Sequence, residues 1–303
     1  MIRACQSNKT NMKDQQQYYV FIGIELDTVK LEIRLPADKL QRLQEQTREW
    51  KGRKAGTNRD LLSLIGTLNH ACKAVRQGRS FLRWLIDLSK VALHLHHHIR
   101  LNVSARSDIQ WWYQFAASWN GVSMLLERKK QNPDVVVTSD ASGNWGCGAY
   151  CESQWFQLKW MDCIKTMHIT IKEFVPVVMA AAIWGTSWAG KSVLIRSDNA
   201  AVVAVINSGT SRDHEVMHLM RCLVFISAKF NFIFSAAHIP GIHNQLADAL
   251  SRDNYQYFES HYPQAQRLAS PIPQALVNLL MVSKPDWTSQ HWSSLWSTIF
   301  VRA

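Results

Sequence analysis

The sequence lacks the features that mark secreted and membrane-embedded proteins. Its 303 residues include only six cysteines and no Cys-x-x-Cys pair, so a disulfide framework is not indicated. No run of about 18 apolar residues without charges is present, which argues against a membrane-spanning helix. The first residues, MIRACQSNKTNMKDQQQ, lack the apolar stretch of a secretory signal. These absences favour an intracellular protein with free thiols and no membrane partner.

Charged residues are scarce and unevenly placed. They make up 19% of the chain, yet the formal net charge is +11. Residues 1–133 hold 22 lysines and arginines against 11 acidic residues, whereas residues 134–253 hold 9 against 10. A basic segment beside a neutral one suggests that the first part contacts a polyanion. The charge alone leaves open a second interpretation, a solvated basic face that only keeps the protein soluble.

Composition and apolar patterning divide the chain into four parts. We expect a disordered N-terminus at 1–17, a mostly helical segment with an N-terminal β-hairpin at 18–132, an α/β domain at 133–253, and a linker or the truncated start of a further domain at 254–303. The boundary near 132 follows from the polar run Lys129–Pro133, after which strand-like segments replace helical ones.

The segment 18–132 begins with a strand pattern and continues with helical ones. Apolar and polar residues alternate through Tyr18–Leu35 around Asp27 and Thr28, which predicts a β-hairpin that turns there. Caps and apolar spacing of 3.6 residues predict helices at 36–50, 57–78, 80–88 and 105–119. The histidines at 94, 96, 97 and 98 have no cysteine or acidic residue beside them, which argues against a metal site and leaves them without an assigned role.

The segment 133–253 alternates strands and helices. Strands are expected at 135–140, 145–151, 155–160, 193–197 and 230–236, and helices at 171–188, 199–207, 213–229 and 245–251. Hairpin strands followed by alternating helices and strands predict an α/β fold with helices on the faces of a sheet.

Four acidic residues occupy strand ends and helix starts in this segment. Asp140 ends the strand VVVTSD and Asp198 ends the strand VLIRSD. Glu173 lies near the start of the long helix, and Asp248 lies in the last one. Strand ends and neighbouring helix starts are where α/β proteins build their sites. Several carboxylates gathered there would repel one another without a metal, so divalent cations such as Mg²⁺ are the expected compensation.

Each acidic residue also has a structural interpretation when it is taken singly. Asp140 is suited to a turn, and Asp198 is suited to capping the helix that follows it. Glu173 is suited to the positive end of a helix dipole, and Asp248 is suited to an ion pair with Arg252 four residues later. The order of all four is more informative than any one of them.

The motifs that carry these acids resemble the ribonuclease H domain attached to reverse transcriptases. The matching segments are TSDASGNWGCGAY, HITIKEFVPVVMAA, IRSDNAAVVAVIN and AHIPGIHNQLADALSR. The resemblance implies a mixed five-stranded sheet flanked by helices, and two Mg²⁺ ions, with Mn²⁺ as a substitute, held by Asp140, Glu173, Asp198 and Asp248. It also implies that His238, ten residues before Asp248, assists turnover at the scissile phosphate. The remaining motif residues expected to contact nucleic acid are Ser142, Asn199 and Asn244.

The resemblance continues upstream into the basic segment. FIGIELDTVKLEIRLPADKL is similar to the strand pair that ends a reverse-transcriptase palm, and LLSLIGTLNHACKAVRQGR is similar to the thumb helix that follows the minor groove of a duplex. The residues this implies in nucleic-acid binding are Gly66, Asn69, His70, Lys73, Arg76 and Arg79. The whole arrangement, including WNG at Trp119–Gly121, looks most like polyproteins of DIRS-type retrotransposons, which use a tyrosine recombinase.

One expected polymerase feature is missing. The sequence contains no Asp-Asp pair, whereas a reverse transcriptase needs its palm aspartates. We therefore expect the upstream polymerase part of the parent polyprotein to be absent from this chain. The expected activity is metal-dependent cleavage of the RNA strand of RNA–DNA hybrids. A catalytically silent nucleic-acid-binding remnant and a 3′–5′ exonuclease on a similar sheet stay open as alternatives.

Overall fold

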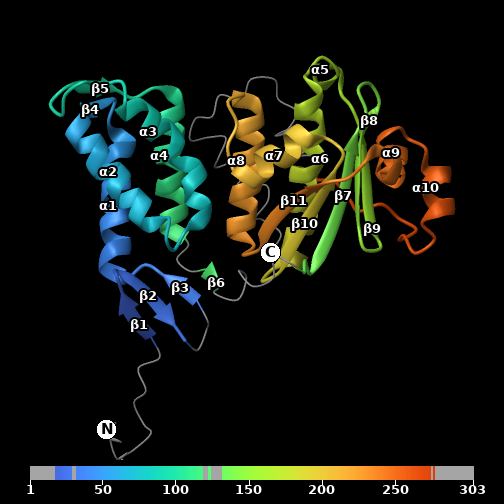
Figure 1. Cartoon of the computed structure of the whole chain (residues 1–303), viewed down its shortest axis with the longest axis horizontal. Coiled ribbons are helices and arrows are strands. Elements are labelled where there is room, and N and C mark those ends of the chain that lie inside the picture. The colour runs from blue at the N-terminus through green and yellow to red at the C-terminus, as the bar shows by residue number, and fades with distance from the viewer. Residues whose placement is uncertain (1–17, 29–31, 119–121, 124–131, 274–275, 277–303) are drawn as a thin grey trace, which may run out of the picture.

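The computed structural model describes residues 18–28, 32–118, 122–123, 132–273 and 276 (Figure 1). The expected disordered N-terminus 1–17, the motif at 119–121 and most of the tail beyond 273 lie outside the described residues. What the sequence predicts for these residues therefore stays a prediction.

A small antiparallel sheet opens the described chain. Its strands are β1 (Tyr18–Phe21), β2 (Ile24–Asp27), β3 (Glu32–Arg34) and β6 (Val122–Ser123), in that order across the sheet. The expected turn after Asp27 separates β2 from β3, because Asp27 pairs with Glu32. The sequence analysis missed an earlier turn at Ile22 and Gly23, whose φ angles are 51° and 70°. Positive φ at both central residues is the geometry of a two-residue hairpin turn. The residues that usually indicate this turn are Asn, Asp or Gly, so an isoleucine at its first position does not predict it.

Helices build the rest of the first segment. They are α1 (Ala37–Gly52), α2 (Asn58–Ala71), the 3-10 turn η1 (Arg76–Phe81), α3 (Arg83–Ser89) and α4 (Val103–Ser118). Thr57 caps α2, since its hydroxyl accepts a hydrogen bond from the Asp60 amide. Aromatic residues of α4 belong to the core, because Trp111, Trp112 and Phe115 are each at most 2% exposed. Two short strands unforeseen in the sequence, β4 (Ala55–Thr57) and β5 (His98–Arg100), pair with each other.

The second segment forms a mixed five-stranded sheet in the order β11-β10-β7-β8-β9. The antiparallel strands are β7 (Val135–Ala141), β8 (Gly146–Cys151) and β9 (Gln154–Lys159). On the other side of β7 lie two parallel strands, β10 (Ser192–Ser197) and β11 (Ile233–His238). This mixed sheet and its flanking helices, preceded by a helical segment with a β-hairpin, confirm the expected fold class.

Helices cover both faces of this sheet (Figure 1). On one face lie α6 (Ile169–Trp184), α7 (Ala200–Ser208) and α8 (His214–Lys229), and on the other lie α9 (Gln245–Ser251) and α10 (Tyr255–His261). A short helix, α5 (Asp162–Lys165), joins β9 to α6. The stretch Ile169–Trp188 is the one described helix long and apolar enough to cross a membrane, but 72% of its apolar window is buried inside the protein. It is the core helix that the sheet packs against.

Residues after 253 continue the packing of the sheet. The Tyr262 hydroxyl donates a hydrogen bond to the Glu152 carbonyl oxygen at 2.7 Å. The backbone amides of Gln266 and Ser270 donate to the carbonyl oxygens of Ser153 and Trp155. The segment therefore covers the edge strand β9, as edge strands require. The stretch to residue 270 therefore packs against the sheet. The predicted domain boundary at 253 stays a prediction.

The helical segment and the sheet are joined by specific contacts. Asp108 on α4 and Arg221 on α8 form a salt bridge at 2.5 Å, with side-chain exposures of 0% and 8%. Trp84 stacks on His214 with ring centroids 4.8 Å apart. The Ser80 hydroxyl donates to the Gly209 carbonyl oxygen at 3.1 Å. These contacts hold η1 and α3 against α8.

The described cysteine thiols are free and buried, as the sparse spacing predicted. They are Cys72, Cys147, Cys151 and Cys222. Burial raises the pKa of the Cys72 and Cys151 thiols to about 12, so both are unreactive as nucleophiles at neutral pH.

Candidate metal centre and nucleic-acid interface

The register of two neighbouring parallel strands brings Asp140 and Asp198 to the same level. In β7 and β10, Thr138 lies beside Arg196. Two residues further along each strand are Asp140 and Asp198, on the same side of their strands because side chains alternate with a period of two. Both carboxylates therefore stand at the carboxyl edge of the sheet, where open α/β sheets place their sites.

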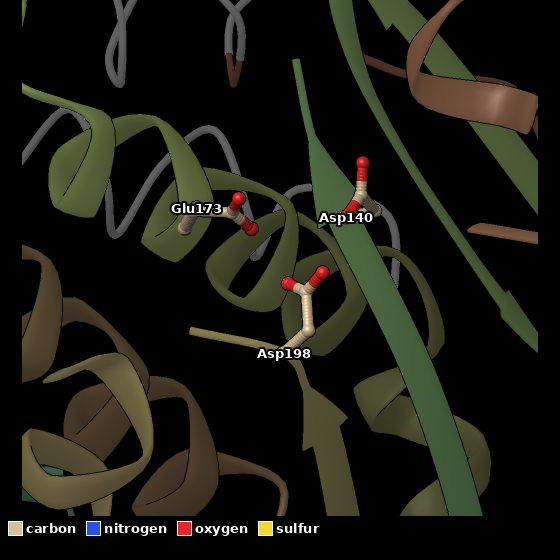
Figure 2. A group of neighbouring side chains, drawn as sticks. All are labelled: Asp140, Glu173 and Asp198. Atoms are coloured by element: carbon tan, nitrogen blue, oxygen red, sulfur yellow. The ribbon is translucent and has the colours of Figure 1, made fainter. Parts of the chain in front are cut away.

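Glu173 reaches the same point from helix α6. It lies in the second turn of this helix, because α6 begins at Ile169 rather than 171. One ligand oxygen of each of Asp140, Glu173 and Asp198 lies within 4.8 Å of the others, and this is the one such group among the described residues. Figure 2 shows the three carboxylates facing one another across the gap between helix and strands. Three of the four predicted ligands are thus brought together.

Burial and mutual repulsion make this group costly to ionise. Burial raises the pKa of Glu173 to about 9, and the nearby carboxylates of Asp140 and Asp198 add to the rise. The pKa of Asp140 rises to about 6, chiefly through burial, although a hydrogen bond from Ser251 opposes the shift. Carboxylates with pKa values raised in this way cluster at functional sites.

The chemistry of the group fits a divalent cation. Oxygen is the only donor type in the triad, and hard cations such as Mg²⁺ prefer carboxylate oxygens. The Glu173 Oε2 atom is buried and has no hydrogen-bond partner among the described residues. Among those residues none of the three carboxylates forms a salt bridge. An unpartnered buried carboxylate oxygen is what a bound metal would satisfy.

Asn244 positions the first aspartate of the group. Its side-chain amide donates to Asp140 Oδ1 at 3.1 Å and to the Ser139 carbonyl oxygen at 3.3 Å. The resemblance implied that Asn244 contacts nucleic acid. Its side chain is only 1% exposed, which is too deeply buried for direct contact. The structure instead gives it a supporting role, in which it holds the rotamer of Asp140.

Asp248 lies outside the close group. Its carboxylate Oδ1 accepts a hydrogen bond from Arg252 Nε at 2.6 Å, the i,i+4 pair that the sequence allowed. It is still near enough to raise the pKa of Asp140 and of Glu173 by repulsion. Helix α9, which carries it, packs closely on β8, because a Cβ at Gly148 would come within 2.4 Å of the Leu250 Cβ. Its role as the fourth ligand stays a prediction.

His238 ends strand β11 beside the group. Its Nε2 lies 3.0 Å from the Asp198 carbonyl oxygen, so Nε2 carries the proton in this contact. The loop that follows passes over the second aspartate, since a Cβ at Gly241 would lie 3.4 Å from Asp198 Oδ2. The exposed ring of His238 is therefore next to the carboxylates, where the sequence placed it.

The other two motif residues serve as local anchors. The Ser142 hydroxyl accepts hydrogen bonds from the amides of Trp145 and Gly146 and donates to the Ser251 carbonyl oxygen. With 4% exposure, Ser142 holds the β7–β8 turn instead of contacting nucleic acid. Asn199 caps α7 by accepting from the amides of Ala201 and Val202. It is partly exposed, so its predicted contact with nucleic acid stays open.

No known protein family and no curated protein matches the sequence. Among solved structures, the chain is similar to ribonuclease H1 from the halophilic archaeon Halobacterium salinarum NRC-1, with 15% identity and a TM-score of 0.31 over 40% of this chain and 98% of that one. It is also similar to the foamy viral protease-reverse transcriptase dRH in complex with double-stranded DNA, with 13% identity, a TM-score of 0.30, and 73% of this chain against 38% of that one. A third similarity is to the foamy viral protease-reverse transcriptase in complex with an RNA/DNA hybrid, with 11% identity, a TM-score of 0.29, and 73% against 29%.

The chain thus spans less than half the length of the two viral proteins it resembles. The geometry that matters is the buried carboxylate group and the surfaces beside it.

A groove between α1 and α2 gathers several predicted nucleic-acid contacts. It has a volume of about 300 Å³. Gly66 and His70 line it, and Asn69, Lys73 and Arg79 are at least partly exposed nearby in sequence. A side chain at Gly66 would meet open space, so the glycine leaves the backbone of α2 accessible. The side chain of Arg76 lies outside the described residues.

Two basic residues in this groove were missed by the sequence analysis. Lys39 and Arg42 lie on α1, three residues apart and both exposed. The i,i+3 spacing on a predicted helix was the available signal, because it places both cations on one face. A third missed residue, Lys172, is 4% exposed and donates from Nζ to the carbonyl oxygens of Gly143 and Lys165. It ties the loop after β7 to the helix that carries Glu173.

The histidine cluster is not part of the carboxylate site. The rings of His94, His96 and His97 lie 4.9–5.6 Å apart, centroid to centroid, on the loop before β5. Their nitrogens do not form a metal-ligand group among the described residues. The role of these histidines stays unassigned.

Proposed function

We propose that this chain is a metal-dependent endonuclease that hydrolyses the RNA strand of RNA–DNA hybrids, leaving a 3′ hydroxyl and a 5′ phosphate. The observation that carries the proposal is the convergence of Asp140, Glu173 and Asp198 within 4.8 Å. A buried, strained group of carboxylates at a sheet edge supports divalent-cation chemistry on a phosphodiester. The ribonuclease H motifs of the sequence select the hybrid as substrate.

The residues of the proposed site have different roles. Asp140, Glu173 and Asp198 would hold Mg²⁺, or Mn²⁺ in its place, and Asp248 would join them as the fourth ligand. The metal, when bound, supplies a water of lowered pKa and charge stabilisation at the phosphate. Asn244 and Ser251 keep the Asp140 carboxylate in place. His238, with its Nε2 proton directed at the Asp198 carbonyl oxygen, would stand beside the departing product.

Substrate binding is assigned to the basic first segment. Lys39 and Arg42 supply cations at the α1–α2 groove, and Gly66 allows close approach of a duplex. Hybrids are recognised by shape, phosphates and 2′-hydroxyls rather than by sequence. Affinity for a hybrid is therefore expected to fall steeply with salt, since each neutralised phosphate releases counterions.

A cleavage assay on a labelled hybrid tests the proposal. With Mg²⁺ or Mn²⁺, the purified chain is expected to cut the RNA strand of the hybrid and to spare single-stranded RNA and duplex DNA. Asp140→Asn should abolish cleavage while hybrid binding persists, because one oxygen ligand is replaced by an amide of the same shape. Wild-type cleavage no greater than that of Asp140→Asn would refute the enzymatic proposal. Cleavage of a circular hybrid separates an endonuclease from an exonuclease.

A catalytically silent nucleic-acid-binding protein is the second candidate. The observation that favours it is the pairing of Asp248 with Arg252, which keeps this carboxylate out of the close group. Under this alternative the wild type binds hybrids with the salt dependence described above and cuts none. The same assay distinguishes the two, since binding and cleavage are read separately.

We also propose that the chain derives from a retroelement of the DIRS type and acts inside the cell. The reverse-transcriptase-like motifs on both sides of residue 133 support this origin. Because the sequence holds no Asp-Asp pair, primer extension on an RNA template is expected to yield no product from this chain alone. Extension by the purified chain would contradict this expectation.

A further inference from the structure

Trp145 is an exposed aromatic residue beside the carboxylate group. Its side chain is 56% exposed, and it is the only described tryptophan among the exposed large apolar residues. It lies in the turn between β7 and β8, directly before Gly146. An exposed indole offers a flat apolar face with one polar N–H group, which suits contact with a ligand that is partly apolar and partly polar.

The backbone that carries this indole is fixed from three sides. The Trp145 amide donates to the Ser142 hydroxyl at 3.0 Å, and the Trp145 carbonyl oxygen accepts from the Trp160 amide at 2.8 Å. The Ser142 hydroxyl also donates to the Ser251 carbonyl oxygen on α9, and the Lys172 ammonium donates to the Gly143 carbonyl oxygen. The elements that carry Glu173 and Asp248 thus hold the turn, so the backbone of Trp145 is fixed relative to the carboxylates.

A narrow groove runs past the indole. It has a volume of about 130 Å³ and is lined by Trp145, Gln157, Lys159, Leu250 and Asp253, among others. This is too small for a drug-sized molecule, for which pockets of about 300 Å³ or more are usual. The exposed Lys159 supplies a cation at its rim. An apolar platform with a cation at the rim matches a sugar ring and the phosphate attached to it.

The turn that carries Trp145 lies directly beyond the end of β7, the strand that carries Asp140. The pair Asp140–Gly148 and the turn bond from Ser142 to Gly146 are two residues apart along the hairpin, about 7 Å at the usual rise of a strand. A duplex strand advances roughly 3.4 Å per nucleotide, so the turn stands within a few nucleotides of a phosphate held at the carboxylates. In a paired duplex the base faces are stacked and closed, which leaves the sugars of the shallow minor groove as the apolar surface a tryptophan can meet.

We propose that Trp145 and the groove beside it form a contact site for the minor-groove sugars of the hybrid, within a few nucleotides of the cut. This inference rests on the proposed function, because the hybrid is its ligand. Trp145 acts in substrate binding and takes no part in the chemistry. Its contact sets the register of the strand over the carboxylates.

Oxidative footprinting of the full chain in the Asp140→Asn background tests the contact without cleavage. A hybrid bound by this variant is expected to protect Trp145 from hydroxyl radicals, with Leu93 on a loop of the helical segment as an exposed reference at 86%. Single-stranded RNA should protect it less than the hybrid does. Protection by single strands alone, or no protection by a bound hybrid, overturns the proposal.

Binding constants supply the second measurement. Trp145→Ala should weaken hybrid binding about tenfold and Trp145→Phe less, because an aromatic contact with a nucleotide contributes a substantial share of binding. Leu93→Ala, a matched removal of an exposed apolar side chain, should leave binding unchanged. Equal binding by the wild type, Trp145→Ala and Trp145→Phe overturns the proposal.

The two proposals fail in different ways. Protection of Trp145 in a wild type that never cuts would refute the nuclease and keep the contact site. Cleavage by a wild type whose Trp145 is not protected would refute the contact site and keep the nuclease.

Discussion

The side-chain amide of Asn244 donates to Asp140 Oδ1 at 3.1 Å across 104 positions of sequence. Asn244→Ala is therefore expected to release the Asp140 carboxylate and to lower metal affinity and cleavage rate by roughly tenfold or more, as losses of outer-shell partners do. Isothermal titration with Mn²⁺ and a cleavage assay measure both.

The control for this variant is Asn207→Ala. Asn207 also bridges a helix to a strand, through two hydrogen bonds of 2.9 Å with the backbone of Ala236. Both variants should lose about 1–3 kcal/mol of unfolding free energy, but only Asn244→Ala should lose metal affinity. Equal metal affinity in the two variants would contradict the positioning role of Asn244.

The raised pKa values predict how the metal-free protein responds to pH. Glu173, with a pKa of about 9, and Asp140, with a pKa of about 6, bind protons more tightly in the folded than in the unfolded chain. At pH values above the ordinary carboxyl pKa of about 4 and below these raised values, the folded state therefore holds more protons than the unfolded chain. The free energy of unfolding accordingly falls as pH rises from about 4 towards 9. Urea unfolding in EDTA across this range measures the slope.

Glu173→Gln provides the control for this slope. It should flatten the fall and raise the stability of the metal-free protein by roughly 1–3 kcal/mol at pH 7, since each unit of pKa shift corresponds to about 1.4 kcal/mol. It should also abolish stabilisation by Mg²⁺. A pH slope unchanged by Glu173→Gln would mean that other groups set the acid–base behaviour of the fold.

The Asp248–Arg252 ion pair predicts a competition between a side chain and a cation. Because the guanidinium at 2.6 Å already neutralises Asp248, Arg252→Gln should free this carboxylate and tighten binding of a further Mn²⁺ ion several-fold. Arg83→Gln is the matched control, since Arg83 and Asp87 form an i,i+4 pair with similar exposures of 58% and 37%. Manganese titration followed by electron paramagnetic resonance counts the bound ions. Identical titrations for Arg252→Gln and Arg83→Gln would rule the competition out.

The buried Asp108–Arg221 pair predicts coupling between the helical segment and the sheet. Asp108→Asn leaves the Arg221 charge buried and unpaired, which should cost about 3–5 kcal/mol of unfolding free energy. The double variant Asp108→Leu with Arg221→Met should regain most of this loss, because no unpaired charge then remains. Denaturant unfolding of Asp108→Leu, Arg221→Met and the double variant gives the coupling. A double variant less stable than either single one would show that the pair is not the source of the loss.

Local sequence signals were sufficient for the main sheet and for three of the four carboxylates that were expected to meet. Strands that end in aspartate, a helix that carries glutamate near its start and an α/β order of elements predicted which residues meet, because parallel neighbouring strands bring their ends to one edge. The motif order placed His238 and Asn244 near the same edge. Turns were harder to predict from the sequence. The hairpin turn at Ile22 and Gly23 has positive φ angles at both residues, and isoleucine rarely adopts such an angle.

Contacts between distant segments were decided by packing in three dimensions. Residue type alone did not reveal that Asn244 and Ser142 are buried supports, because an amide or hydroxyl serves equally well at the surface and in the interior. For Asp248 the sequence allowed both an ion pair with Arg252 and a place among the ligands, and only the folded structure shows the pair formed while Asp140, Glu173 and Asp198 converge. The approach of the carboxylates depends on the strand register and on how closely α9 packs against Gly148. Both are properties of the tertiary structure.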